Sequence, residues 1–132
     1  MDDIFSVKDT ILLVTGGSRG IGKMIARSFV ERGATVIISS RKIDACEEVA
    51  AELSAVGRCD ALPADLSQMA EIERLSQTIM ERYGRLDVLV NNAGATWGAP
   101  LGGFPESGWD KTMDINLRAP FFLTQKLLPA LK

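Results

Sequence analysis

The residues best suited to chemistry are glycines that follow the first apolar run of the chain. The segment reads Thr15-Gly16-Gly17-Ser18-Arg19-Gly20-Ile21-Gly22 and precedes a predicted helix. In that context Gly16 permits a tight turn, Gly20 lets a phosphate approach the backbone, and Gly22 lets the helix pack closely on the strand. The free N–H groups at the amino end of a helix attract a pyrophosphate. The segment predicts a phosphate-binding turn, and a plain glycine-rich turn is the alternative.

A regular pattern of strands and helices must position that turn. Apolar and β-branched runs predict strands at residues 11–14, 35–39, 59–62 and 86–90. Amphipathic segments predict helices at residues 20–32 and 43–56, between Ser67 and Gly84, and at residues 109–131. Strands that alternate with helices imply right-handed crossovers and a parallel sheet covered on both faces. The fold class is therefore α/β, of the doubly wound, Rossmann-like type.

Individual residues predict how these helices begin, end and bend. Gly33 should end the first helix, and Asp44 and Glu47 have the spacing of a capping box in the second. Ser67 should cap the third helix, and Pro120 should kink the fourth. The apolar stripe of the first helix consists of Ile21, Ile25 and Phe29.

Composition excludes several classes of function. The chain has 132 residues, a net charge of −2 and no histidine, which argues against nucleic acid as a partner and excludes histidine-based triads and metal clusters. Cys46 and Cys59 have neither zinc nor redox spacing, so we expect two buried, reduced thiols and no metal site. No apolar run is long enough for a membrane span, and Met1-Asp2-Asp3 lacks the features of a signal peptide. These features predict a cytoplasmic protein without a membrane partner.

Four motifs in the expected order resemble the short-chain dehydrogenase/reductase family. Thr15 to Gly22 resembles its T-G-x-x-x-G-I-G signature, and Asn91-Asn92-Ala93-Gly94 resembles its N-N-A-G motif. Asp65-Leu66 matches the pair that the family places at the adenine, and Asn116 matches the helix asparagine of its catalytic set. The resemblance covers the whole chain and implies a sheet with strand order 3-2-1-4.

The resemblance also implies which residues bind a dinucleotide. The implied cofactor-binding residues are Gly16, Ser18, Arg19, Gly20, Ile21, Gly22, Ser40, Arg41, Asp65, Leu66, Asn92, Ala93 and Gly94. Asn116 is the one implied catalytic residue, thought to hold a water in a proton relay. Without the resemblance, Asp65 could simply bridge strand and helix, Asn92 to Gly94 could be a tight turn, and Asn116 could be merely exposed.

The residues after the second strand predict which nicotinamide cofactor is preferred. An acidic residue there would bind the adenosine ribose and select NAD, but this chain has Ser40 followed by Arg41. The planar guanidinium of Arg41 suits a 2′-phosphate, and Arg19 resembles a second basic position of NADP-preferring members. We therefore expect NADP (NADPH), bound at least about tenfold more tightly than NADH. The alternative for Arg41 and Lys42 is a solvated loop.

The rest of the family's catalytic set is missing from this sequence. In the family a serine polarises the carbonyl, and a tyrosine, tuned by a lysine four residues later, donates a proton. The single tyrosine here is Tyr83, and the residue four positions later is Asp87. No serine follows Ser107. We therefore expect residues 1–132 to be the dinucleotide-binding part of one domain, truncated before the fifth strand and inactive alone.

Substrate and assembly are implied only by resemblance. Residues 14–22, 63–67 and 91–98 are similar to 3-oxoacyl-[acyl-carrier-protein] reductases, including those of rhamnolipid synthesis, which implies a small-molecule or acyl-carrier carbonyl substrate. The family's assembly through the helix of Asn116 implies a homo-oligomer, tetramer or dimer. The alternatives are a non-catalytic nucleotide-binding module and a scaffold with the same fold. Trp97 could border a substrate cleft or anchor its own loop.

Overall fold

The computed structural model describes residues 4–131. Met1 to Asp3, used above to predict a cytoplasmic location, and Lys132 lie outside the described residues. The elements in chain order are β1 (Ile11–Thr15), α1 (Gly20–Glu31), β2 (Thr35–Ser39), α2 (Ile43–Ser54), β3 (Arg58–Ala61), α3 (Met69–Tyr83), β4 (Val88–Val90), a 3-10 turn (Leu101–Gly103), α4 (Glu106–Met113), a π turn (Asp114–Arg118) and α5 (Ala119–Leu131).

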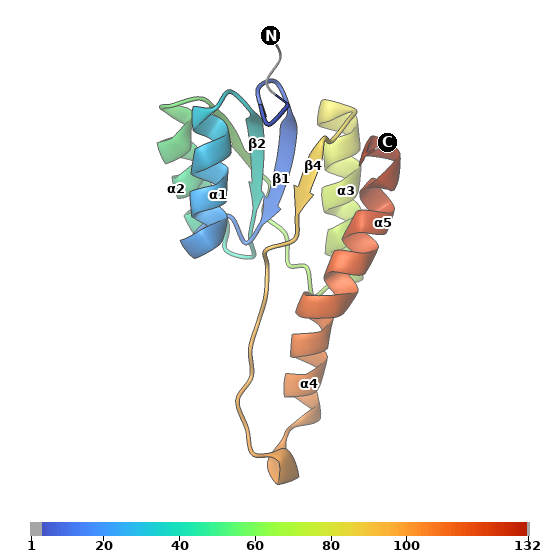
Figure 1. Ribbon diagram of the computed structural model, residues 1–132. Helices are drawn as coiled ribbons and strands as arrows, with labels where there is room; N and C mark the ends of the chain where they lie inside the picture. Colours follow the sequence, from blue (N-terminus) through green and yellow to red (C-terminus); the bar gives the residue numbers. More distant parts are fainter. Residues whose placement is uncertain (1–3, 132) are drawn as a thin grey trace.

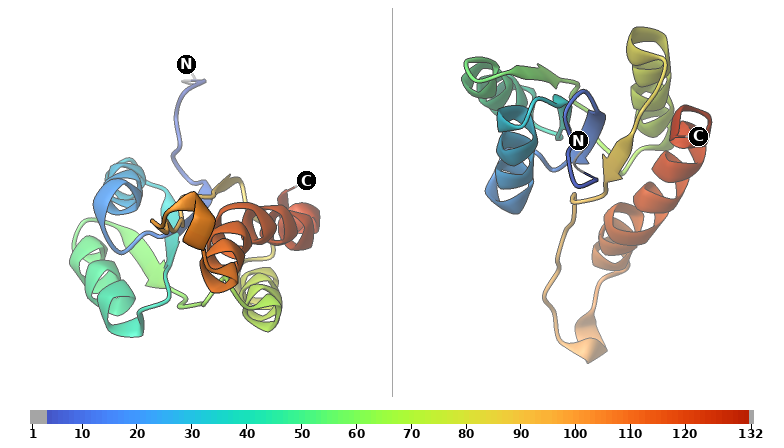
Figure 2. Two further views of the ribbon diagram at one scale, coloured as in Figure 1. Left: turned by 90° about the horizontal axis from the view of Figure 1, so that it is seen from below. Right: turned by 45° about the horizontal axis from the view of Figure 1, so that its top comes forward.

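The four strands form one parallel sheet in the order β3-β2-β1-β4, which confirms the predicted fold and strand order. Helices α1 and α2 cover one face of the sheet, and α3 and α5 cover the other (Figures 1 and 2). All four strands point the same way, so the turns that follow them meet at one edge of the sheet. Every predicted site segment except that of Asn116 follows one of these strands.

Alternation along the strands divides the core into two clusters. Leu13 and Ile37 are fully buried in the cluster beneath α3 and α5, whereas Leu12 and Ile38 are fully buried in the cluster beneath α1 and α2. Successive side chains of a strand point to opposite faces, so a continuous apolar run serves both clusters. Cys46 and Cys59 are buried in the second cluster as free thiols, as predicted.

The predicted apolar stripe of α1 is wrong for Ile21, whereas Ile25 and Phe29 are partly buried and pack against the core beneath α1 and α2. Ile21 is 70% exposed, and the residues of α1 that are buried are Gly22, Ala26 and Val30. These residues also repeat every four positions, so spacing alone does not distinguish the two faces. Helix α1 begins very close to the sheet, and its smaller side chains therefore face inward.

Two of the predicted helix caps are also wrong. Helix α2 begins after Lys42, which places Asp44 inside the first turn, and no side chain caps it. Helix α3 begins after Gln68, because Ser67 is engaged with Asp65 instead of the helix. The prediction for Gly33 is confirmed: its φ is +87°, and it follows the last residues of α1. Strands β3 and β4 begin at Arg58 and Val88, one residue earlier and two residues later than predicted.

The predicted fourth helix begins at Glu106 and runs through α4, the π turn and α5. The irregularity expected at Pro120 lies just before it, in the π turn of residues 114–118. Proline has no N–H, so the carbonyl of Asn116 loses its α-helical donor, and such a gap favours a π turn. Residues 95–113, here called the arm, extend beyond the sheet (Figure 1). Across residues 4–131, no helix has the length and apolarity needed to cross a membrane.

Candidate functional site

The turn after β1 has the backbone geometry of a phosphate-binding loop. Gly16 and Gly20 have φ angles of +66° and +56°, a region that favours glycine. The N–H of Gly16 donates to the carbonyl of Ser39, 2.7 Å away, which ties this turn to the end of β2. No side chain caps the amino end of α1. The first N–H groups of that helix are therefore available to an anionic ligand.

Gly22 is the closest contact between α1 and the rest of the site. A β-carbon at this position would lie 2.2 Å from the carbonyl oxygen of Gly16 and 2.5 Å from the side-chain nitrogen of Asn92. Only glycine fits there. Its small size brings the amino end of α1 against both the first turn and the segment after β4, which is the close packing predicted for this residue.

A buried hydroxyl joins β1 to the segment after β4. Thr15 is 1% exposed, and its Oγ1 accepts hydrogen bonds from the N–H groups of Asn92 and Ala93, each 3.0 Å away. The same hydroxyl donates to the carbonyl of Val90 at 3.4 Å. The side-chain amide of Asn92 donates to the carbonyl of Gly16 at 3.2 Å. Sequence reasoning did not include Thr15 among the site residues, although it opens the first motif.

Asn116 lies against the residues that follow this segment. Its Nδ2 donates to the carbonyl of Ala95 at 2.6 Å, and its Oδ1 accepts from the Ala95 N–H at 3.1 Å. A β-carbon at Gly94 would lie 3.0 Å from the same Oδ1. The structure therefore brings Asn116 next to the predicted cofactor-binding segment Asn92 to Gly94. Its carboxamide holds the start of the arm to the π turn.

A groove of about 500 Å³ opens beside Asn116. Its walls are mostly apolar and include Leu117, Pro120, Phe121 and Leu128, with the polar Asn91 at one side. Phe121 and Leu128 are 62% and 45% exposed. The groove is large enough for a small organic molecule and adjoins the Asn91 to Gly94 motif at the end of β4.

The predicted determinants of cofactor preference lie on the surface beyond β2. The guanidinium groups of Arg19 and Arg41 are exposed, and neither has an ion-pair partner within residues 4–131. Ser40 is half-buried and donates from its hydroxyl to the carbonyl of Lys42 at 3.3 Å. Both guanidinium groups are therefore available to a phosphate. The half-buried Ser18 and the exposed Ile21 lie on the first turn, between Gly16 and Gly22.

Asp65 and Leu66 follow β3 at the same edge of the sheet. Asp65 accepts hydrogen bonds through Oδ1 from the N–H and hydroxyl of Ser67, at 3.0 and 2.7 Å. The side chain of Leu66 is buried in the core, so only its main chain can face a ligand. The N–H of Asp65 donates to the carboxylate of Glu71 at 3.4 Å. The Arg74 guanidinium, hydrogen-bonded to Glu71, lowers the pKa of that carboxyl.

Trp97 holds the first part of the arm against α4. A β-carbon at Gly108 would stand 2.7 Å from three ring atoms of Trp97, so the indole packs directly on the backbone of α4. The Lys111 ammonium lies 5.8 Å from the ring centroid, within cation–π range. These contacts favour the loop-anchor interpretation of Trp97, although the ring is still 41% exposed.

The only tyrosine occupies a structural position. Tyr83 is half-buried at the end of α3, and its hydroxyl donates to the carboxylate of Asp60 on β3. Burial, together with the negative charge and hydrogen bond of Asp60, raises the pKa of Tyr83 well above its ordinary value. The catalytic tyrosine described for the family needs a lowered pKa instead. Asp87, four positions later, accepts from the N–H of Ile11 at 2.8 Å and pairs with Arg85, so it is also structural.

The residues present fit a dinucleotide. The first turn has a glycine cradle that a β-carbon would fill, free N–H groups and two free guanidinium groups beside it. The turns after β1 and β4 are joined by hydrogen bonds, and the predicted residues after β2 and β3 lie at the same edge of the sheet. Within residues 4–131, no cluster of acidic or cysteine side chains could hold a metal ion.

Comparison with known proteins places this arrangement in a family. Residues 10–132 match the family model for short chain dehydrogenases. The rhamnolipids biosynthesis 3-oxoacyl-[acyl-carrier-protein] reductase of Pseudomonas aeruginosa is 52% identical over the whole chain, which covers 52% of that protein. The sepiapterin reductase of Chlorobaculum tepidum is 41% identical over 89% of the chain, and 51% of that protein is covered.

Two solved structures have the same fold. The Pseudomonas aeruginosa RhlG/NADP active-site complex superposes with a TM-score of 0.92 at 52% identity, over 99% of this chain and 51% of that one. A metagenomic short-chain oxidoreductase in complex with NADP gives a TM-score of 0.90 at 37% identity, over 96% of this chain and 58% of that one. The chain thus spans about half the length of these relatives. It belongs to the short-chain dehydrogenase family.

Proposed function

We propose that this chain is the dinucleotide-binding part of an NADP-dependent oxidoreductase, and that residues 1–132 form part of a single domain. The observation that carries the proposal is the junction at Gly22, where α1, the turn after β1 and Asn92 meet too closely for any side chain. That junction aims the uncapped amino end of α1 at the edge where the predicted site residues gather. A pyrophosphate is the ligand that such an end accepts.

The preference for NADP over NAD rests on charge. Arg19 and Arg41 are exposed without ion-pair partners in residues 4–131, and residues 40–43, directly after β2, include no carboxylate. A guanidinium binds the 2′-phosphate in a bidentate manner that an unphosphorylated ribose cannot match. The NADP and NADPH complexes among the solved relatives support this preference.

The reaction we propose is hydride transfer between NADPH and a carbonyl substrate, with a 3-oxoacyl thioester as the first class to test. NADPH supplies the hydride when bound. Gly16, Asn92 and the amino end of α1 orient the cofactor, and Asn116 holds the start of the arm beside the groove. We propose no proton donor within residues 4–131, because the only tyrosine of the sequence is bonded to Asp60.

The second candidate is a nucleotide-binding module without catalysis. It is favoured by the structural role of Tyr83 and by the lack of a Tyr-x-x-x-Lys sequence. A scaffold without cofactor affinity is disfavoured, since the glycine cradle and the free guanidinium groups would have no purpose in it.

Calorimetric titration of the purified protein with NADPH and NADH tests the proposal first. We expect NADPH to bind at least about tenfold more tightly, consistent with one charge-assisted phosphate contact. Equal affinities would overturn the NADP preference, and no binding of either would overturn nucleotide binding. NADPH oxidation with 3-oxoacyl thioesters, by the protein isolated from its natural source, then separates the oxidoreductase from the binding module.

We also propose a homo-oligomer, dimer or tetramer, in the cytoplasm. The proposal of an oligomer is supported by the family's assembly through the helix that contains Asn116. The proposal of a cytoplasmic location is supported by the two buried free thiols. Light scattering of the natural protein and fractionation of its cells test these two statements. A monomer would overturn the first, and recovery from an exported fraction would overturn the second.

A further inference from the structure

We propose that Arg118 is a positioning residue that couples the turn after β3 to the π turn carrying Asn116. The inference rests on the proposed function, because it concerns two segments of the proposed site. No motif of the sequence includes Arg118. Its role follows from its two contacts, with Ser67 and with Asp114.

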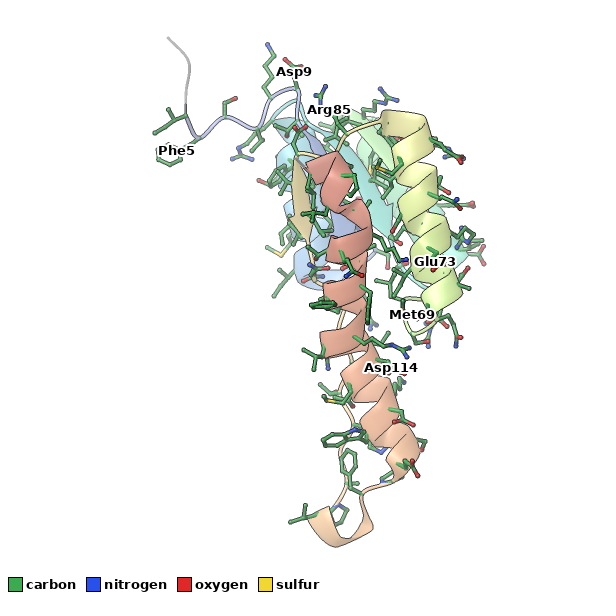
Figure 3. All side chains as sticks on the ribbon, turned by 90° about the vertical axis from the view of Figure 1, so that its right-hand side faces the viewer. Phe5, Asp9, Met69, Glu73, Arg85 and Asp114 are labelled. Carbon is green, nitrogen blue, oxygen red and sulfur yellow. The ribbon has the colours of Figure 1, made fainter. Side chains whose placement is uncertain are left out.

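Arg118 makes a short contact with a distant part of the chain. A terminal guanidinium nitrogen donates to the carbonyl of Ser67 at 2.6 Å, across 51 residues of sequence. The same nitrogen lies 3.4 Å from a carboxylate oxygen of Asp114, at the start of the π turn. Figure 3 shows Asp114 at the base of the arm, in the same part of the molecule as Met69 at the start of α3. Arg118 thus joins the π turn to the segment that precedes α3.

The Ser67 end of this contact belongs to the proposed adenine side of the site. Ser67 gives both its N–H and its hydroxyl to Oδ1 of Asp65, so its peptide group is held on one side by Asp65. Arg118 holds the same residue from the other side through its carbonyl. A shift of Arg118 would therefore move Ser67, and with it the carboxylate of Asp65.

The other end of the contact belongs to the π turn that carries Asn116. Asn116 and Arg118 occupy one π turn of five residues, and Asn116 makes both hydrogen bonds of its carboxamide with Ala95. The missing N–H of Pro120 favours this π turn, and contacts with distant residues hold it in place. Its polar contacts are those of Asn116 with Ala95 and of Arg118 with Ser67, and Ile115 packs against the core. Without Arg118, the turn would lose its link to Ser67, and we expect Asn116 to move.

The chain offers a control in the helices that follow these two segments. Lys126 of α5 forms an ion pair with Glu73 of α3 at 3.3 Å, with both side chains substantially exposed. Like the Arg118 contact, it joins the last helical part of the chain to the region of α3 through a basic side chain. It touches neither Asp65, Ser67 nor the π turn. Lys126→Gln therefore removes a comparable link without altering the proposed coupling.

The test compares Arg118→Gln with Lys126→Gln in the natural, full-length protein. NMR of the Asn116 side-chain amide and the Ala95 N–H reports the π turn, calorimetry gives NADPH affinity, and steady-state kinetics separate kcat from KM. We expect Arg118→Gln to shift both resonances, and to weaken NADPH binding and lower kcat by about tenfold each, with KM for the carbonyl substrate unchanged. Lys126→Gln should change none of these. If Arg118→Gln does not fold, Arg118→Lys replaces it, because lysine keeps the positive charge but lacks the planar guanidinium.

The results separate this inference from the proposed function. Resonance shifts in Arg118→Gln alone, with a fall in kcat that disappears in an Asn116→Ala background, would support positioning through Asn116. Equal losses of melting temperature in both variants, with resonances and kinetics unchanged, would overturn it. If the unsubstituted protein binds no NADPH, the proposed function fails, whereas shifted resonances would still support the coupling.

Discussion

Gly22 and Gly16 lie so close together that a β-carbon on Gly22 would stand 2.2 Å from the carbonyl oxygen of Gly16. The contact joins the first turn of α1 to the turn that follows β1. It fixes the direction of the helix axis relative to the sheet, and thereby the direction in which the free N–H groups of α1 point. The geometry of the proposed pyrophosphate site therefore depends on having glycine, which lacks a side chain, at position 22.

Gly22→Ala should destabilise the fold. The added methyl group meets backbone atoms and the amide of Asn92, which cannot move independently, so we expect a loss of about 1–3 kcal/mol in the free energy of unfolding. Urea denaturation measures it. Gly98→Ala is the matched control, because a β-carbon there meets nothing within 4 Å and should change stability by no more than about 0.5 kcal/mol. Equal stability of the two variants would contradict the close contact.

Thr15→Val should be more harmful than Thr15→Ser. Valine removes the acceptor for the N–H groups of Asn92 and Ala93 in a buried position, which costs about 1–3 kcal/mol. Serine keeps the oxygen and loses one methyl group, a loss of about 0.8 kcal/mol. Chemical denaturation of both variants gives the order. A valine variant at least as stable as the serine variant would show that the hydroxyl does not hold the segment after β4.

The fold was largely predictable because it depends on features that are local in sequence. Strands β1 and β2 are buried and β4 half-buried, and all three appeared as apolar runs; the alternation of strands with helices limited the topology to a parallel sheet. The inward face of α1 was not predictable in the same way. Ile21 and Gly22 begin two adjacent stripes with identical spacing, and only the closeness of the sheet makes the glycine stripe the buried one.

Site residues were predictable where they belong to a contiguous sequence motif. They were not predictable where they make contact with residues far away in the sequence. The positions of Gly16, Gly22 and Asn92 followed from their motifs. The hydroxyl of Thr15 reaches a residue 77 positions away, and Arg118 reaches one 51 positions away. No local pattern indicates such pairs. The roles predicted for Ser18, Ser40 and Asp65 in binding a cofactor remain predictions.

Arg41→Ala should weaken NADPH binding by about 10- to 100-fold and leave NADH binding nearly unchanged, since a charge-assisted hydrogen bond contributes about 1.5–3 kcal/mol. Lys8→Ala is the control: it also removes one exposed positive charge, but it lies beside Gly33, at the opposite edge of the sheet. Calorimetry at two salt concentrations separates a local contact from a change in net charge. Similar losses for both variants, or for both cofactors, would argue against a 2′-phosphate contact at Arg41.

The thiol of Cys59 should make the fold sensitive to alkaline pH. Burial, with smaller contributions from Asp60 and Cys46, raises the pKa of this thiol from 9.0 to about 12. Because the folded pKa lies above the unfolded one, the stability linked to Cys59 is fully present below about pH 9 and declines as the pH rises toward 12. Between these values an unfolded chain ionises the thiol and a folded chain does not.

Cys59→Ser removes this titration and gives the measurement. The free energy of unfolding of the unsubstituted protein should fall relative to that of the variant between about pH 9 and pH 10, by at most about 1.4 kcal/mol per pH unit. Other groups that titrate in this range are common to both proteins, so the difference isolates Cys59. A chromogenic disulfide reagent adds an independent check: neither thiol should react in the folded protein at neutral pH, and both should react in urea. Parallel stability curves, together with rapid labelling of the folded chain, would show that Cys59 is not buried in solution.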